Sequence, residues 1–292
     1  MTTPPQSQPD WREREYNPEQ YKTQYQIAGG VILVSIGVII GALLFRDPGY
    51  WANLFTEVIS VAVTVGLFGI ITEHRHTQQW KARLRHEAGS QSNERAKSAV
   101  EDLRWKGWLT VEDKSPLLKG EDLVLANLQG ANLWKANLQG AVLGGANLQG
   151  ALLSYTNLQG ADLLSAKLQG ADLGKANLQG AKLERANLQD AQLWLTNLQG
   201  ADLPEANLQG ADLERANLQG ARLWLANLQN AHLSADLQGT QLHRANLQGA
   251  NLTGAKFDDK TVLPDRTHWT PDTDMQRFTD PNHPNFWQPP KK

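Results

Sequence analysis

The chain has 292 residues, a formal net charge of −2 and no cysteine. Without cysteine it has no disulfide, no thiolate metal site and no thiol nucleophile, and the near-neutral charge excludes a strongly basic nucleic-acid-binding protein. The length suits about two domains, and the composition changes sharply along the chain.

The first 72 residues predict a tail followed by two membrane spans. Residues 1–26 are rich in Pro, Gln and charged residues and lack an apolar run, so we expect a disordered N-terminal tail. Residues 27–45 and 54–72 are each about as long as the ~20-residue apolar stretch that crosses a bilayer as a helix. A buried soluble helix is the alternative for each stretch, and a cleaved signal peptide is a further alternative for the first. The pattern favours a transmembrane helical hairpin at 27–72.

Basic residues beside these spans predict their orientation. Arg75, Lys81, Arg83 and Arg85 follow the second span, whereas the turn between the spans contains only Arg46. Because cytoplasmic flanks carry the excess of Lys and Arg, we expect a multi-pass membrane protein with two spans and both termini in the cytoplasm. Membrane lipid is then a partner of the hairpin.

Residues 73–120 predict a helical linker and an N-terminal cap. Two stretches, 73–88 and 91–109, have helical patterns. The second stretch has four small or apolar residues at the spacing of one helical face: Ala96, Ala99, Val100 and Leu103. Terminal units of repeat arrays need a cover, so we expect this face to pack against the first unit of the domain that follows.

From Leu123 the sequence repeats with a period of five. Leu recurs at every fifth position to Leu233 and at four positions after it, and Phe257 closes the series, which makes 28 units. Two positions earlier each unit has Ala or Thr, with Glu121 as the exception. Two inward positions separated by one residue form a short strand-like edge, and the next Gly or polar residue turns the chain. The period excludes an α-helix, a hexapeptide β-helix and a leucine-rich repeat.

These units, among them ANLQG, ADLER, ADLGK and TNLQG, resemble the A(D/N)LXX motif of the pentapeptide-repeat family. The resemblance covers residues 121–259 and implies an all-β right-handed quadrilateral β-helix of about seven coils, with four pentapeptides per coil. It implies that the central residue of each unit points inward, so the predicted core includes Leu128, Leu133, Leu138, Leu143, Leu148, Leu193, Leu223 and Phe257. It also suggests a membrane-anchored member of the kind typical of cyanobacteria and other bacteria.

One corner of this helix is predicted to be irregular. The interval between Leu233 and Leu237 is four residues instead of five, so Ala235 must serve as both turn and inward residue. We expect a local distortion without loss of the stack, because the pattern resumes in the next unit.

The array also has a period of ten, because units that read NLQG alternate with units whose outer residues vary. In a four-sided coil the NLQG units occupy two opposite sides, where stacked amide side chains stabilise the structure without any ligand. Exposed aromatic residues on the other two sides are favoured at interfaces. They predict a candidate protein-binding surface at Trp134, Tyr155, Trp194 and Trp224, with Trp224 opposite Trp134 and Trp194. The alternative is that recent duplication left scattered surface residues.

After Asp258 the frame stops, and residues 260–292 predict an irregular C-terminal cap or tail. Its aromatic residues alternate with Pro and Asp, which suits a plug over the last coil: Trp269, Phe278, Phe286 and Trp287. Such a plug would shield an exposed β-edge from association.

The sequence contains no phosphate loop, nucleophile elbow, metal quartet or catalytic triad. We therefore expect no enzyme, no cofactor, no metal and no small-molecule substrate. A rigid rod behind two membrane helices predicts a scaffold or adaptor that presents the β-helix to an unidentified protein partner at the cytoplasmic membrane surface.

Two alternatives remain for the function. By resemblance, some members of the family imitate duplex DNA in shape and acidity and act on DNA gyrase. Residues 121–257 carry 11 acids and 9 Lys or Arg, however, which is far from the charge density of DNA, so we expect no nucleic-acid partner and rank a gyrase modulator second. A membrane signalling or sensor component is the third hypothesis.

Overall fold

The computed structural model describes residues 67, 68, 70–72, 74–110, 112 and 116–288. The chain divides into two units, Met1–Trp80 and Lys81–Lys292. In the first unit, the described residues from 67 to 80 are helical. The second unit contains helical residues 81–88, helix α3 (Asn93–Trp105), a repetitive coil and helix α4 (Gln276–Thr279).

No helix within the described residues is long and apolar enough to cross a bilayer. This finding overturns the transmembrane hairpin in the predicted fold class, and with it the multi-pass localisation, the cytoplasmic placement of both termini and the lipid partner. The physical reason is that the helical residues 74–88 are mostly polar or charged, so the apolar stretch does not extend into them. The predicted tail 1–26, the first span 27–45 and most of the second, 54–72, lie outside the described residues.

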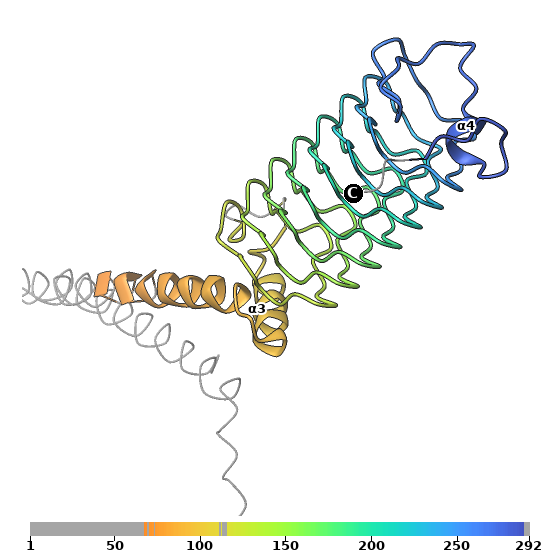
Figure 1. Cartoon of the computed structure of the whole chain (residues 1–292). Coiled ribbons are helices and arrows are strands. Elements are labelled where there is room, and N and C mark those ends of the chain that lie inside the picture. The colour runs from red at the N-terminus through yellow and green to blue at the C-terminus, as the bar shows by residue number, and fades with distance from the viewer. Residues whose placement is uncertain (1–66, 69, 73, 111, 113–115, 289–292) are drawn as a thin grey trace, which may run out of the picture. The chain divides into compact units, whose positions relative to one another are not determined.

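The larger part of the second unit is a four-sided parallel β-helix, as predicted. Each pentapeptide contributes one bridge residue between its small residue and its Leu, and this residue pairs with the one 20 positions along the chain, as in Asn137–Asn157–Asn177. The coils therefore stack one above another in register (Figure 1). We number the sides by the central residue of the first coil and its equivalents in later coils: side 1, Leu123; side 2, Leu128; side 3, Leu133; side 4, Leu138.

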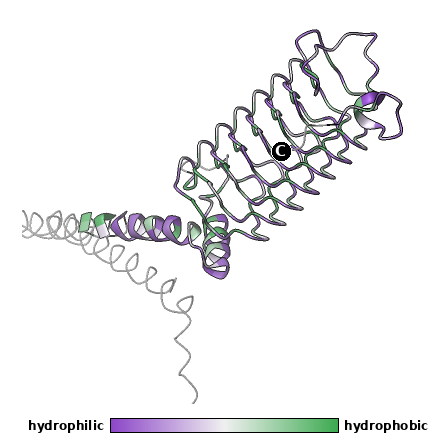
Figure 2. Cartoon of the chain, viewed as in Figure 1, coloured by the Kyte–Doolittle hydropathy of each residue, from purple (hydrophilic) through white to green (hydrophobic). Residues whose placement is uncertain are grey.

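The interior is built from alternating leucines and small residues. The seven leucines of the predicted core are 0% exposed: Leu128, Leu133, Leu138, Leu143, Leu148, Leu193 and Leu223. Each contributes about 1.5–3 kcal/mol relative to an exposed side chain. Figure 2 shows the resulting alternation of hydrophobic and hydrophilic residues along every coil. Phe257 differs, because it is half-buried at the end of side 4 and stacks on Trp269 with ring centroids 5.8 Å apart.

Threonine replaces the inward alanine at four places without leaving an unpaired hydroxyl. Thr156, Thr196, Thr240 and Thr261 are each 0% exposed. Their hydroxyls donate to the carbonyl of the central Leu one coil and one unit earlier, for example Thr196 to Leu173 at 2.8 Å. Because a buried hydroxyl is costly only when it lacks a partner, this bond explains why Thr is accepted in a narrow apolar interior.

The array is one unit longer at each end than the predicted range 121–259. Residues 116–120 form an earlier unit, in which Leu118 is fully buried and the Gly120 amide donates to the Gln139 carbonyl at 2.9 Å. Residues 261–265 form a later unit, in which Val262 pairs with Gln241 and Leu263 is 1% exposed. One extra residue between Phe257 and Leu263 hides this unit from a strict count of five.

The irregular corner lies between Leu233 and Leu237, as the four-residue interval predicts. Asp236 pairs with Asn217, 19 positions earlier, and with Lys256, 20 positions later. Ala235 is 3% exposed and its amide donates to the Leu233 carbonyl at 2.7 Å, which tightens the turn. The missing residue therefore changes one corner and leaves the stacking on both sides of it intact.

The first coil is covered by the segment that contains α3. The four residues of the predicted helical face, Ala96, Ala99, Val100 and Leu103, are at most 1% exposed. Edge groups of the coil find partners in this segment: the Asn127 amide donates to the Ser90 carbonyl at 2.9 Å, and the Asn137 amide to the Leu109 carbonyl at 2.8 Å. The Arg104 guanidinium donates to the carbonyls of Asn132 and Trp134 at 2.9 and 3.0 Å.

Among the described residues, backbone hydrogen bonds cover the last coil on sides 1 and 2, and the Trp269 ring stacks on Phe257 of side 4. On side 1, His268 pairs antiparallel with Val262. On side 2, the Gly249 amide donates to the Thr279 carbonyl at 2.7 Å, and Phe278 in α4 is 1% exposed. The segment 260–288 therefore lies over part of the last coil, in mostly irregular conformation.

Candidate protein-binding site

The four aromatic residues of the predicted surface lie on two opposite corners. Trp134, Tyr155 and Trp194 belong to the corner that follows side 3, in the first, second and fourth coils, whereas Trp224 belongs to the corner that follows side 1. In the third coil the first corner carries Lys175. We call Trp134, Tyr155, Lys175 and Trp194 the aromatic corner.

The backbone at this corner is held in a conformation that favours glycine. The second turn residue of each unit has φ near +60°, as at Tyr155 (60°) and Lys175 (58°). A side chain in this left-handed region costs about 1–2 kcal/mol, and the NLQG corners mostly place Gly there. The same conformation recurs at the corner after side 1, as at Arg185 (56°), so it belongs to the repeat as a whole. The corner therefore retains its side chains against the preference of the backbone.

The side chains of the aromatic corner hold one another in place. The rings of Trp134 and Tyr155 meet edge to face with centroids 6.5 Å apart. Lys175 Nζ donates to Tyr155 Oη at 2.9 Å and lies 5.1 Å from the Tyr155 ring centroid and 5.2 Å from that of Trp194. Cation–π contacts of this kind contribute about 0.5–1 kcal/mol each at exposed sites. The result is a continuous column across four coils.

Gly174 makes room for one end of this column. A Cβ at this position would overlap the Trp194 indole, so only Gly lets the ring lie against the neighbouring coil. Gly174 is a positioning residue that sequence reasoning missed. The signal that could have found it is its distance of 20 residues from Trp194, which places the two at the same corner of adjacent coils.

The aromatic corner is the centre of an exposed apolar patch. Trp134 is 43% exposed and Tyr155 45%, and the flanking Leu152 and Leu195 are 47% and 41% exposed. Lys135 Nζ lies 4.6 Å from the Trp134 ring centroid and 3.5 Å from Glu112 Oε1, which adds a polar rim. Contiguous apolar surface with a polar rim marks interaction sites on folded proteins.

Trp224 has different surroundings and does not extend this patch. Its ring stacks on His243, with centroids 6.0 Å apart and an interplanar angle of 6°. Burial lowers the pKa of His243 below its ordinary value, and the neighbouring Arg266 and Arg244 lower it further, which favours the neutral imidazole. The predicted four-residue surface is therefore not contiguous.

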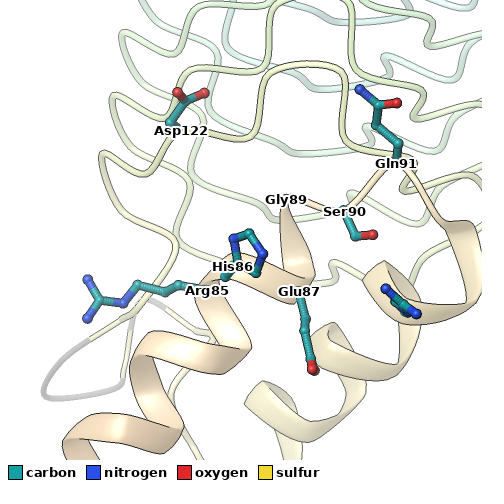
Figure 3. A pocket seen from close by; sticks show the side chains of 8 residues that line it. Arg85, His86, Glu87, Gly89, Ser90, Gln91 and Asp122 are labelled. Atoms are coloured by element: carbon teal, nitrogen blue, oxygen red, sulfur yellow. The ribbon is translucent and has the colours of Figure 1, made fainter.

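A polar hollow of about 440 Å³ lies between helical residues 81–88, the start of α3 and the first coil (Figure 3). Its lining includes His86, Arg95 and Asp122. Arg85 is paired with Glu121 at 3.0 Å, and its guanidinium points away from the hollow in Figure 3. Across the described part of the chain, no three His, Asp or Glu side chains are grouped to hold a metal ion. The hollow thus offers no defined ligand chemistry.

The repeated units match a known family. The family model for pentapeptide repeats matches in eight copies, which together span residues 118–259. The four-sided coil with inward leucines is the fold that the resemblance implies. The chain belongs to the pentapeptide-repeat family.

Several solved structures are similar to the repeat region. HetL, a pentapeptide-repeat protein involved in heterocyst differentiation regulation from the cyanobacterium Nostoc sp. strain PCC 7120, is 33% identical over 52% of this chain and 86% of HetL, with a TM-score of 0.23. Rfr23 from the cyanobacterium Cyanothece 51142 is 41% identical over 33% of this chain and 63% of Rfr23, with a TM-score of 0.23. This chain thus spans less than two thirds of Rfr23.

A third similar structure is QnrB1, a plasmid-mediated fluoroquinolone resistance protein. It is 20% identical over 49% of this chain and 84% of QnrB1, with a TM-score of 0.25. No curated protein matches the sequence.

Proposed function

We propose that this chain is a non-enzymatic scaffold or adaptor, and that the aromatic corner is the surface on which it binds a protein partner. One observation carries the proposal: two tryptophans and a tyrosine are partly exposed and are joined into a column by a lysine. Trp and Tyr are enriched among the few residues that dominate binding energy at interfaces. The fixed column is the kind of anchor that such interfaces use.

Rigidity supports the same proposal. Binding costs free energy when side chains or loops must be ordered at the interface. At the aromatic corner this ordering is already present, because Lys175 bridges two coils and Gly174 seats the Trp194 ring. A partner therefore meets a preformed surface.

The charge pattern of the array does not favour the gyrase-modulator alternative. A DNA mimic needs acids that stand alone at high density. Some acids on the side-1 surface are instead paired with arginines, namely Asp202 with Arg222 at 2.8 Å and Glu205 with Arg185 at 3.4 Å. No feature of the described residues favours a sensor role either.

The test compares three forms of the full-length protein in cells: wild type, the double variant Trp134→Ala/Trp194→Ala, and Trp224→Ala as a matched control. Proximity labelling from the array identifies the partner. We expect the wild type and the control to enrich the same protein, and the double variant to bind it at least about 30-fold more weakly, since loss of a dominant anchor costs about 2 kcal/mol or more. Enrichment that survives in the double variant and is lost in the control would overturn the assignment.

A further inference from the structure

The last coil has an open edge on sides 3 and 4. In every interior coil, the amide of the central residue donates to a carbonyl of the next coil, as Leu233 does to Asn251 at 2.8 Å. In the last coil, the backbone amides of Leu252, Gly254 and Phe257 have no hydrogen-bond acceptor among the described residues. The carbonyls of Ala250 and Ala255 have no hydrogen-bond donor there either. We call residues 250–257 the open edge.

Side-chain burial shows the same incompleteness. Leu233 and Leu237, one coil earlier on the same two sides, are 0% exposed. Leu252 and Phe257 are only half-buried, and the residues between them are exposed or half-buried. The open edge therefore presents apolar surface together with unpaired backbone groups, and this combination is a template for an added strand.

The geometry of both ends decides what can occupy the open edge. Another copy cannot stack its first coil there, because residues 89–120 seal that coil. A complete four-sided coil of any kind is also blocked, because His268 and Thr279 already cover sides 1 and 2. The main-chain groups without a partner among the described residues lie on two sides, which is the length of two pentapeptides, and on side 4 the Trp269 ring already stacks on Phe257.

We propose that the open edge binds an extended segment of a protein partner, which adds a strand on sides 3 and 4. Its main chain would donate to the carbonyls of Ala250 and Ala255 and accept from the three free amides, as in other cases of strand addition. The spacing of the array predicts that the bound segment has a small side chain followed two positions later by an aliphatic one that faces Leu252. On side 4 the Trp269 ring already occupies the equivalent place against Phe257. This site is separate from the aromatic corner.

The test uses a fluorescent peptide, ADLERANLQG, which copies residues 211–220 on sides 3 and 4 of an interior coil. Fluorescence anisotropy with the full-length protein should show saturable binding with a Kd below about 1 mM. A control peptide with both leucines replaced by serine should bind at least about 10-fold more weakly, because it lacks the inward side chains. Hydrogen exchange of residues 250–257 should slow at least about 10-fold in the complex.

Variants locate the binding. Leu252→Asp and Phe257→Asp should each weaken it at least about 10-fold, because they place a charge under the added strand. Leu125→Asp, at a 54% exposed position in the first coil, should bind like the wild type. The Trp134→Ala/Trp194→Ala protein should also bind like the wild type, which separates this proposal from the proposed function. Circular dichroism checks that each variant is folded.

Three outcomes overturn the proposal. The first is equal binding of the leucine and serine peptides, or binding of neither. The second is unchanged binding by both edge variants while hydrogen exchange shows no protection of residues 250–257. The third is self-association of the wild type in sedimentation velocity that Phe257→Asp abolishes, because the occupant would then be a second copy.

Discussion

The amide sides, 2 and 4, and the variable sides, 1 and 3, share one interior but use their outer residues differently. On side 4, asparagines bond from coil to coil at 3.1–3.5 Å, and a parallel row of glutamines does the same at 3.1–3.3 Å. The equivalent positions on side 3 hold unlike residues and form no such row in the described structure: Asn132, Leu152, Asp172, Gln192 and Asp212. Two sides thus supply stability, and the other two are free to carry recognition.

The corners repeat this division. The corners after the amide sides mostly end in Gly at positive φ, whereas those after the variable sides mostly hold larger residues in the same conformation. The backbone is least strained at the corners after the amide sides, and more strained at the corners after the variable sides.

The largest loss of stability should come from truncating a core leucine, and it should be the same on amide and variable sides. Leu193 on side 3 and Leu198 on side 4 are both 0% exposed. Either change to Ala should lower the free energy of unfolding by about 2–5 kcal/mol, from lost burial and the cavity left behind. Denaturant unfolding of the two variants measures this. A cost for Leu193→Ala well below that for Leu198→Ala would show that the sides do not share one interior.

Asn and Gln side chains on the outer surface should contribute to stability on the amide sides but not on the variable sides. Asn197 Oδ1 accepts from the Gln199 amide at 3.2 Å and from Asn217 Nδ2 at 3.4 Å, and its Nδ2 donates to Asn177 Oδ1 at 3.1 Å. Asn197→Ala should cost about 3 kcal/mol of stability, at about 1 kcal/mol per hydrogen bond. The matched variant Gln192→Ala, on the exposed surface of side 3, should stay within about 0.5 kcal/mol of the wild type. Similar thermal shifts for both would remove the distinction between the sides.

Two opposite substitutions, one from Gly and one to Gly, test the difference in backbone strain between the corners. Gly200 has φ +62° and open space where a Cβ would lie, so Gly200→Ala should cost about 1–2 kcal/mol through backbone conformation alone. Arg215 has φ 56° at a variable corner, so Arg215→Gly should raise stability by about 1 kcal/mol. Unfolding midpoints measure both changes. If Arg215→Gly lowers the midpoint, the Arg215 side chain stabilises the fold by more than its backbone conformation costs.

A substitution at Gly174 should have the smallest effect on stability but should move a neighbouring side chain. Gly174→Ala should move the Trp194 ring away from the column while changing stability by less than about 1 kcal/mol, because the ring is at the surface. In fluorotryptophan NMR, the Trp194 resonance, assigned with Trp194→Phe, should shift. Gly144→Ala is the matched control, since its nearest side-chain neighbour would be 3.9 Å from the new Cβ. An unmoved Trp194 resonance would show that Gly174 does not position the ring.

The interior could be predicted from the sequence because one steric rule, Leu every five residues with a small residue two before it, sets the whole coil. The same rule missed residues 261–265, since one inserted residue broke the count, although Thr261 stands two before Leu263 as Thr196 does before Leu198. The hairpin prediction was wrong, because composition alone does not fix where an apolar helix ends.

The candidate site could be predicted only in part. Spacing alone placed Trp134 and Trp194 on one side and Trp224 opposite. The bridge through Lys175 could not be predicted, because periodicity gives the corner of a residue but not the direction of its side chain. The space that Gly174 leaves is a relation between two coils, which a reading along the chain does not show.

The four-fold coil also constrains how such a chain can grow. The stretches LWLTNLQ and LWLANLQ, which contain Trp194 and Trp224, are nearly identical and begin 30 residues apart. A segment copied over one and a half coils keeps its core leucines inside and its amide rows in place, yet arrives rotated by half a turn. Copying in steps of ten residues therefore preserves the rod while exchanging its two variable sides, and only steps of 20 return an outer residue to its original side.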